Sequence, residues 1–198
     1  LPLLPSDPAP ADGSSFTLAA FRLGNPHNPY PVHTVLGFLF TKLPWGTVAW
    51  RVNLLSATAG AAASALMYLL VYTVVQRRFE GLTGRNVVAH LSGVVGALSL
   101  AFSLSFWQVA EKAEVYTLNA LLLIGLLLLL LRWDETGRRG FLHAGALVYG
   151  LSFGLQYFNV AYFPALVLFI ALSRHRSSVA AIRPVSIAAL FLLGGLLQ

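Results

Sequence analysis

Long apolar runs separated by short polar turns are the feature that most constrains this chain. Residues 53–75 and 87–107 carry no Asp, Glu, Lys or Arg, and the run 114–131 ends in six consecutive leucines. At about 1.5 Å rise per residue, a helix of about twenty residues crosses a hydrocarbon core of about 30 Å. These runs therefore predict transmembrane helices.

The composition supports a membrane protein. The chain has 198 residues, 57% of them hydrophobic and 10% charged, which differs from the balance of a soluble globular domain. Thirteen Lys and Arg against seven Asp and Glu give a net charge of +6. In a chain of this kind a basic excess is first a topology signal, and no nucleic-acid-binding motif accompanies it, so no nucleic-acid partner is expected. The absence of cysteine excludes disulfides, thiolate metal sites and cysteine nucleophiles.

The remaining segments are less regular. Residues 1–31 hold seven of the ten prolines, which excludes a continuous helix over most of the segment and predicts an extramembrane loop. Residues 32–43 form a short apolar stretch flanked by Lys42 and Trp45, which favours a helix lying at the interface. Residues 141–173 are apolar but too long for one span, so a break is predicted near residues 156–159.

These segments predict an all-α polytopic membrane protein of about five to six transmembrane helices. Residues 1–50 are expected to form an extracytoplasmic loop with a short interfacial helix, and residues 51–198 a transmembrane helical domain. The chain begins with Leu1 rather than Met and stops inside the apolar run 185–197, so truncation at both ends is expected.

The basic residues predict the orientation. The turns at residues 76–86, 132–140 and 174–184 hold nine of the thirteen Lys and Arg. By the positive-inside rule these turns are cytoplasmic, and the N-terminal loop and residues 107–114 are extracytoplasmic. Several polar side chains are then expected to share one outer pocket: Asp7, Asp12, His27, Arg51, Glu111 and Glu114.

The polar stretch 106–119 is the chemically richest part of the chain, because it separates two apolar runs. If it is helical, one side carries Trp107, Glu111 and Glu114, and another carries Lys112, Tyr116 and Asn119. Carboxylates at a membrane boundary are often functional. Glu114 also suits the start of a helix, where a carboxylate interacts with the helix dipole.

Three motifs resemble those of a known family. Residues 27–31 read His-Asn-Pro-Tyr-Pro, residues 50–56 read Trp-Arg-Val-Asn-Leu-Leu-Ser, and Phe-Trp at 106–107 precedes Ala-Glu-Val-Tyr-Thr-Leu-Asn at 113–119. In this order they resemble a family of bacterial membrane proteins related to the eukaryotic plexin-type protein O-mannosyltransferases. The resemblance covers about residues 12–172. It implies a C-type glycosyltransferase fold, a bacterial inner-membrane location and a polyprenyl-phosphate sugar as donor.

The resemblance also implies roles for individual residues. Such transfer needs a carboxylate to take a proton from the acceptor hydroxyl or to help bind a divalent cation, and cationic groups to stabilise the leaving phosphate. Asp12 and Glu114 are the implied catalytic carboxylates. The implied substrate-binding residues are His27, Tyr30, Arg51, Trp107, Tyr116 and Asn119. No residues are assigned to a metal, because the five histidines are scattered and no metal-binding motif occurs.

Structural roles remain open for the same residues. Asp12 precedes Gly13, a pair typical of turns, and Arg51 stands where a side chain can extend to the membrane surface.

The chain also departs from the family pattern. Ser15 stands where the family has Glu, and Gln156 stands where it has His. Two hypotheses follow: an active glycosyltransferase, or a catalytically degenerate homologue that serves as an accessory subunit of a larger membrane complex. A transporter is the weaker third, since no inverted repeat or pair of intramembrane charges is evident. The expected partners are the lipid bilayer, a lipid-linked sugar and other membrane subunits.

Overall fold

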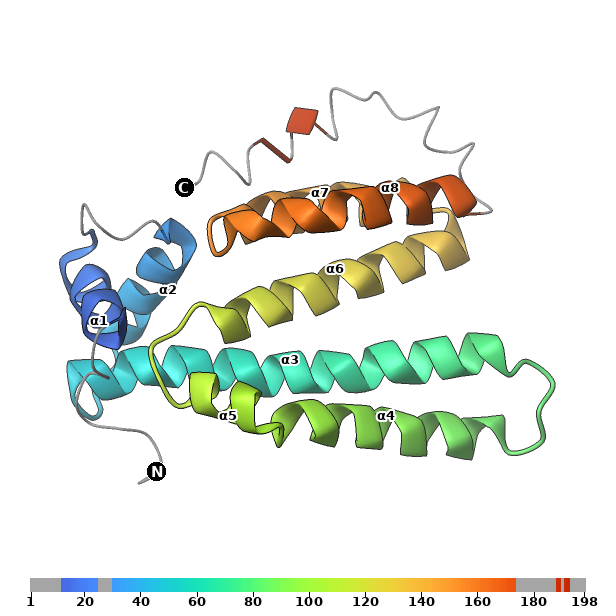
Figure 1. Cartoon of the computed structure of the whole chain (residues 1–198), viewed down its shortest axis with the longest axis horizontal. Coiled ribbons are helices and arrows are strands. Elements are labelled where there is room, and N and C mark those ends of the chain that lie inside the picture. Colours follow the sequence, from blue (N-terminus) through green and yellow to red (C-terminus); the bar gives the residue numbers. More distant parts are fainter. Residues whose placement is uncertain (1–11, 25–29, 174–187, 190, 193–198) are drawn as a thin grey trace.

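A computed structural model describes residues 12–24, 30–173, 188–189 and 191–192. Within these residues every regular element is helical, so the predicted all-α class is confirmed (Figure 1). The elements are α1 (Asp12–Arg22), α2 (Pro31–Thr41), α3 (Val48–Arg78), α4 (Arg85–Ala101), α5 (Leu104–Ala110), α6 (Tyr116–Thr136), α7 (Arg139–Phe153), the 3-10 helix η1 (Tyr157–Tyr162) and α8 (Phe163–Leu172).

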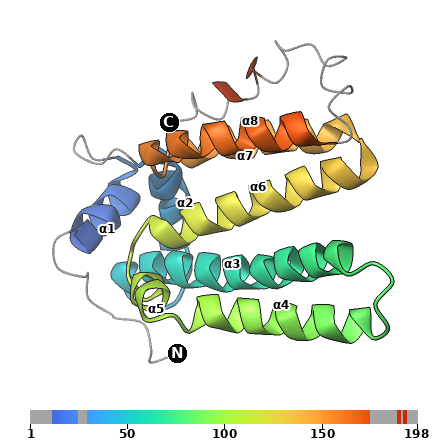
Figure 2. The same cartoon turned by 45° about the vertical axis from the view of Figure 1, so that its right-hand side comes forward.

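Helix α3 is the central element of the fold. It has 31 residues, so it extends beyond the predicted run 53–75 at both ends. The side chain of Thr47 accepts a hydrogen bond from the backbone N–H of Trp50 at 3.2 Å and caps the helix start. Arg77 and Arg78 occupy the last turn, where cations interact favourably with the helix dipole. Helix α4 lies along one side of α3 and α6 along the other, as two views agree (Figures 1 and 2).

Glycines let α4 approach α3 closely. A Cβ added at Gly93 would lie 2.7 Å from Cδ2 of Tyr68, and one added at Gly96 would lie 2.8 Å from Cγ2 of Val71. Nearer the start of α3, Gly60 allows α5 to approach closely, since a Cβ added at Gly60 would lie 3.3 Å from Cβ of Ala110. Small residues at such crossings are typical of helices that pack within membranes.

The second predicted span is not one straight helix. Helix α4 ends at Ala101, Ser103 has an extended backbone (φ −64°, ψ 133°), and α5 continues at an angle of 63° to α4. The expectation of one continuous helix over residues 87–107 was therefore wrong. The bend places α5 against α3 near Gly60.

The predicted break near residues 156–159 is confirmed. Helix α7 ends at Phe153, Gln156 is extended, and η1 begins at Tyr157. A buried network holds this turn. The amide of Asn159 donates to Oδ1 of Asn119 at 2.8 Å and to the carbonyl of Ser152 at 2.9 Å, and the hydroxyl of Tyr149 donates to the carbonyl of Asn159 at 2.9 Å.

The N-terminal segment contains a helix that the sequence analysis did not predict. Helix α1 covers Asp12–Arg22, although residues 1–31 were expected to be mainly loop. The prolines of that segment lie at or before position 10 and at or after position 26, so residues 12–22 are free of proline. Phe16, Ala19 and Ala20 recur at helical spacing and are buried against the rest of the fold. The apolar stretch 32–43 was correctly predicted as a helix, now α2.

Two described helices, α3 and α6, are long and apolar enough to cross a membrane, and the bent α4–α5 pair makes a third if counted as one span. Helix α2 and the η1–α8 segment are shorter apolar helices. The count of five to six spans stays a prediction. The exposed side chains of α4 are largely aliphatic, including Val87, Leu91, Val95 and Leu98, as expected of a surface in contact with lipid.

The two ends of the helix bundle differ in chemistry. The turns that contain Arg78, Arg85 and Arg138 lie at the end opposite to α1 and α2 (Figure 1). At this end the Arg77 guanidinium binds Asp134 at 3.1 Å and Glu135 at 3.0 Å and thereby joins α3 to α6. The basic turns that follow α3 and α6 therefore lie at the same end of the bundle, and the side of the membrane on which this end lies stays a prediction. Arg174, Arg176 and Arg183 of the third predicted basic turn lie outside the described residues.

Candidate functional site

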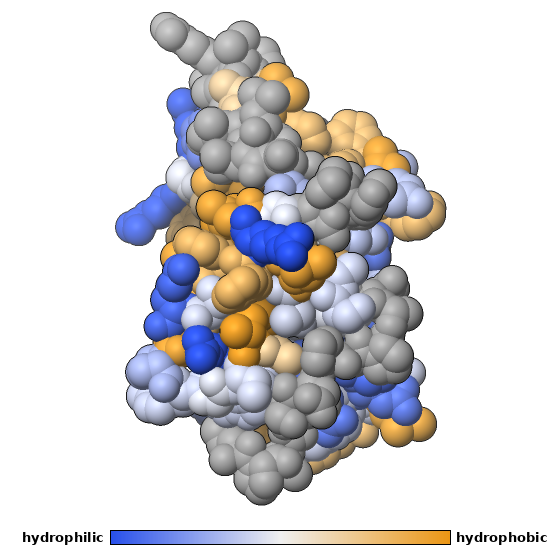
Figure 3. Space-filling view, turned by 90° about the vertical axis from the view of Figure 1, so that its left-hand side faces the viewer, coloured by the Kyte–Doolittle hydropathy of each residue, from blue (hydrophilic) through white to orange (hydrophobic). Residues whose placement is uncertain are grey.

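The candidate site lies at the end of the bundle that carries α1 and α2. The start of α3, helix α5, the loop of residues 111–115, the start of α6 and the turn before η1 are at the same end (Figures 1 and 2). Viewed from this side, hydrophilic residues lie among hydrophobic ones (Figure 3). Parts of the chain that are distant in the sequence therefore meet at this end: α1 and α2, the start of α3, the continuous stretch from α5 to the start of α6, and the turn before η1.

The polar stretch 106–119 is not one helix. Helix α5 ends at Ala110 and α6 begins at Tyr116, so residues 111–115 form a loop. Trp107 and Glu111 do share one side, since the indole N–H of Trp107 donates to Oε1 of Glu111 at 2.5 Å. Glu114 lies beyond the end of α5, so the condition of one continuous helix, under which Glu114 would share a side with these two residues, is not met.

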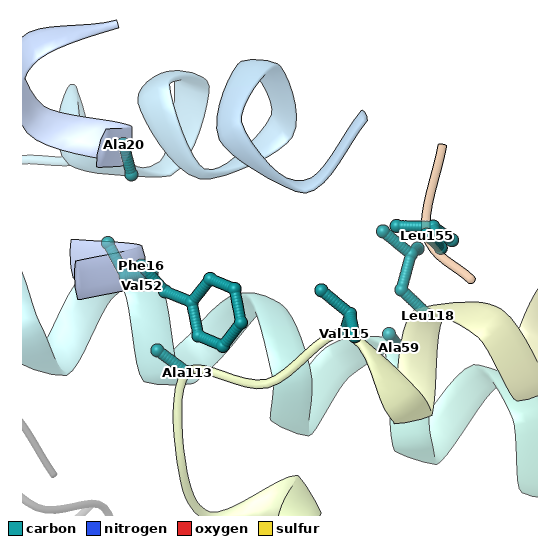
Figure 4. Close-up of a cluster of buried hydrophobic side chains, with 8 residues drawn as sticks. All are labelled: Phe16, Ala20, Val52, Ala59, Ala113, Val115, Leu118 and Leu155. Carbon is teal, nitrogen blue, oxygen red and sulfur yellow. The ribbon is translucent and has the colours of Figure 1, made fainter. Parts of the chain in front are cut away.

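The loop is held by burial of alternate side chains. Ala113 and Val115 are fully or almost fully buried, whereas Glu114 between them is half-buried. The ring of Phe16 from α1 lies among Val52, Ala113 and Val115 (Figure 4). Helix α1 is therefore packed directly on the loop that carries Glu114.

Ser56 fixes the backbone of Glu114 to α3. Its hydroxyl accepts from the backbone N–H of Glu114 and donates to the Glu114 carbonyl, each at 3.1 Å. Ser56 was noticed only as part of the 50–56 motif, and no role was assigned to it. No local pattern in the sequence connects Ser56 to residue 114, which is 58 positions away.

The Arg51 side chain organises the turn between α2 and α3. Its Nε donates to the carbonyl of Trp45 at 2.9 Å, its Nη2 to the carbonyl of Gly46 at 3.0 Å, and its Nη1 to the carbonyl of Thr41 at 2.5 Å. These bonds organise the turn between α2 and α3, and the substrate-binding role that the resemblance implies for Arg51 stays a prediction.

The other predicted residues have distinct environments. Tyr30 is half-buried, and its ring lies 5.4 Å from that of Phe16. Tyr116 is 50% exposed at the start of α6. Asn119 pairs with Asn159 inside the bundle, so this residue braces α6 against the turn before α8. Asn159 itself was missed, although a lone amide in an apolar run is a recognisable signal of a buried polar contact.

Trp107 and Glu111 belong to a different surface from Tyr30. Together with small residues of α3, they line an apolar groove of about 340 Å³ between α3 and α5. Trp107 and Glu111 therefore line this groove, whereas Tyr30 packs against the cluster around Phe16.

Two of the predicted site residues, Asp12 and His27, are described only in part or not at all. Asp12 is the first residue of α1, and the structure describes only its backbone; His27 lies outside the described residues. Ser15 and Gln156, the two departures from the family pattern, are half-buried. In the described part of the chain no group of three His, Asp or Glu side chains is arranged to hold a metal ion.

His33 is an unexpected buried polar residue in this region. It is fully buried in α2, its ring lies 5.1 Å from that of Phe16, and neither ring nitrogen has a hydrogen-bond partner among the described residues. Burial lowers the pKa of His33 from 6.5 to about 4, so the imidazole is neutral at neutral pH.

Long apolar helices with a charged loop at one end define the chain as an integral helical membrane protein. Over residues 12–179 it matches the family described as the protein O-mannosyl-transferase TMEM260 N-terminal domain. The chain belongs to this family, so the predicted relation to eukaryotic O-mannosyltransferases is confirmed.

Two relatives carry the corresponding name. The mouse protein O-mannosyl-transferase TMEM260 is 35% identical over 165 residues, which cover 80% of this chain and 22% of the mouse protein. The Dictyostelium discoideum protein of the same name is 30% identical over 112 residues, which cover 54% of this chain and 12% of that protein. The chain thus spans about a fifth or less of the length of these relatives. No solved structure matches it significantly.

Proposed function

We propose that this chain is the N-terminal membrane part of a glycosyltransferase that transfers mannose from a polyprenyl-phosphate donor to a protein hydroxyl. The family membership supports transfer of a sugar, and the relatives' names supply mannose and the O-linkage. The observation that carries the proposal is the packing of α1, which begins with Asp12, on the loop that carries Glu114.

In this proposal the two carboxylates act on the acceptor. One of them accepts the proton of the acceptor hydroxyl while the hydroxyl oxygen forms a bond to the anomeric carbon of the sugar. The bond between that carbon and the donor phosphate breaks, and the polyprenyl phosphate leaves with the electron pair. Tyr30 and Tyr116 are exposed enough to contact the sugar, and His27 is the remaining candidate for the phosphate.

In this proposal the reaction occurs on the extracytoplasmic side of the membrane, and the Arg-rich end of the bundle faces the cytoplasm, as the positive-inside rule predicts. The proposed orientation can be tested separately from catalysis. Because these 198 residues contain no cysteine, a cysteine introduced among them can be labelled at a known position. Single cysteines in Glu80→Cys and Lys112→Cys, at opposite ends of the bundle, should react with an impermeant thiol reagent from opposite sides of the membrane. Labelling of Glu80→Cys from outside would overturn the orientation. The bacterial inner membrane stays a prediction from the resemblance.

The catalytic proposal is tested with the full-length protein in lipid nanodiscs. Radiolabelled polyprenyl-phosphate mannose and a Ser- and Thr-containing receptor domain are supplied, and labelled protein is measured. Glu114→Gln and Asp12→Asn should each lower the transfer rate at least about 100-fold, the lower end of the range for one acid–base group. Glu80→Gln is the matched control, since Glu80 is an exposed carboxylate at the opposite end. Unchanged transfer in both site variants would refute the assignment.

The accessory-subunit hypothesis is favoured by a specific observation. Ser15 and Gln156 replace a carboxylate and an imidazole of the family pattern, and both lie on elements at the same end of the bundle, α1 and the residue before η1. In this case the full-length protein shows no transfer and co-purifies with other membrane subunits in constant ratio. Isolation as a free, active protein would exclude it.

A further inference from the structure

The loop of residues 111–115 has a fixed position although it lies between two helices. Its residues make few helical backbone bonds, and two of its side chains, Ala113 and Val115, are buried in the cluster around Phe16. Burial of two flanking side chains limits where the backbone of Glu114 lies. It does not by itself fix the direction of the Glu114 side chain.

Ser56 supplies the missing constraint. Its hydroxyl bonds both backbone polar groups of Glu114, the N–H and the C=O, across 58 positions of sequence. Ser56 is 1% exposed, so water has no access to replace the hydroxyl. With groups on both sides of its Cα held to α3, the Glu114 backbone is fixed, and only the side-chain torsions lie between this fixed Cα and the carboxylate.

Helix α3 is a rigid support for this contact. It packs against α1, α2, α4, α5 and α6, and the bonds from Arg51 fix the turn at its start. Arg51 and Ser56 both lie in the 50–56 motif, so the motif organises two loops at this end of the bundle, the turn of residues 41–46 and the loop of residues 111–115.

We infer that Ser56 is a positioning residue for the Glu114 carboxylate, which it aims by fixing the Glu114 backbone to α3. The inference rests on the proposed function, because a positioning role has meaning only if Glu114 takes part in transfer. Ser56 itself contacts neither sugar nor phosphate. It acts through Glu114, since a displacement of about 1 Å at a reacting group can lower a rate by about 100-fold.

The test uses transfer by the full-length protein in nanodiscs. Ser56→Ala removes both hydrogen bonds and should lower kcat by about 10- to 100-fold, with a smaller change in KM. Ser56→Cys keeps a weaker donor and acceptor of similar size, so its kcat should lie between those of the wild type and Ser56→Ala. Thr58→Val is the matched control. It removes a hydroxyl from the same helix, but that hydroxyl bonds the carbonyls of Leu54 and Leu55 in its own helix, so transfer should stay within about twofold.

A double-mutant cycle distinguishes positioning from general loss of structure. In the Glu114→Gln background, Ser56→Ala should cause no further loss of transfer, because the group that Ser56 positions is already absent. Equal fold losses in both backgrounds would overturn the inference and leave the proposed function intact.

Hydrogen exchange at the Glu114 amide gives a readout that does not depend on activity. Loss of the bond from this N–H should speed its exchange about 5- to 10-fold in Ser56→Ala, while amides in the middle of α6 keep their rates. An unchanged rate at Glu114 would overturn the inference. If the wild-type protein transfers no sugar, the proposed function fails and, with it, the positioning role, even where the exchange result shows that the backbone is held.

Discussion

The docking of α1 and α2 should weaken in acid because of His33. The imidazole is buried without hydrogen-bond partners among the described residues, and its pKa is about 4 in the folded protein against 6.5 when exposed. Between these values the open state binds more protons than the closed state. Docking is therefore at full strength above about pH 6.5, falls as the pH drops, and changes no further through this group below about pH 4.

The magnitude follows from the two pKa values. The whole difference corresponds to about 3 kcal/mol, and at pH 5 about 2 kcal/mol of it is lost, which is about a 30-fold rise in the open population. Only burial contributes to the lowered pKa, and α2 is not among the candidate spans. The change should therefore be local to the contact of α1 and α2 with α3.

Hydrogen exchange measures this opening. Exchange of the α1 and α2 amides, corrected for the intrinsic pH dependence, is compared at pH 8 and pH 5 for the wild type and for His33→Leu. The Leu side chain fills a similar volume and cannot be protonated, so the variant should lose the pH dependence. The same 30-fold opening in His33→Leu would refute the assignment to His33. Equal exchange rates of the wild type at pH 8 and pH 5 would refute the conclusion that the His33 imidazole is buried without a hydrogen-bond partner.

Two further substitutions test the packing of the bundle by thermal unfolding in detergent. Gly93→Ala should destabilise the protein by about 1–3 kcal/mol, because the new Cβ would lie 2.7 Å from the Tyr68 ring and 3.0 Å from its carbonyl oxygen. Gly125→Ala is its control, since there the new Cβ meets only Cδ1 of Leu66 at 3.7 Å. Asn159→Leu should cost about 1–3 kcal/mol, because it leaves the Asn119 amide without its partner inside the bundle.

Equal effects of the two glycine substitutions would show that the close approach of α3 and α4 does not limit stability. For the amide pair, the double variant with leucine at both positions should be less destabilised than the sum of the two single variants. Additive losses would mean that the two amides do not depend on each other.

The sequence determined the helical class and the approximate position of most helices. Runs such as 53–75 and 114–131 predict helices because the length of an apolar run is a local property that the bilayer thickness constrains directly. The break at 156–159 was predicted for the same reason, since one helix over residues 141–173 would be too long. The family was recognised from three short motifs, which are also local.

Local patterns failed where packing competes with them. The seven prolines of residues 1–31 led to the prediction of a loop, and helix α1 was therefore missed. Its stability depends on burial of Phe16 and Ala20 against α3 and the loop of residues 111–115. The bend between α4 and α5 was missed because the apolar run continues through Phe102 and Ser103 without a proline to mark it.

Only the tertiary structure decided how the candidate site is built. The stretch 106–119 was identified from the sequence as the chemically important part of the chain, and Glu114 as one of its carboxylates. Its attachment to Ser56, 58 positions away, and the pairing of Asn119 with Asn159, 40 positions away, depend on which helices lie side by side. Apolar periodicity fixes that a helix forms, but a hydrogen bond between helices depends on their relative rotation and approach, which the small residues of α3 and its neighbours set together.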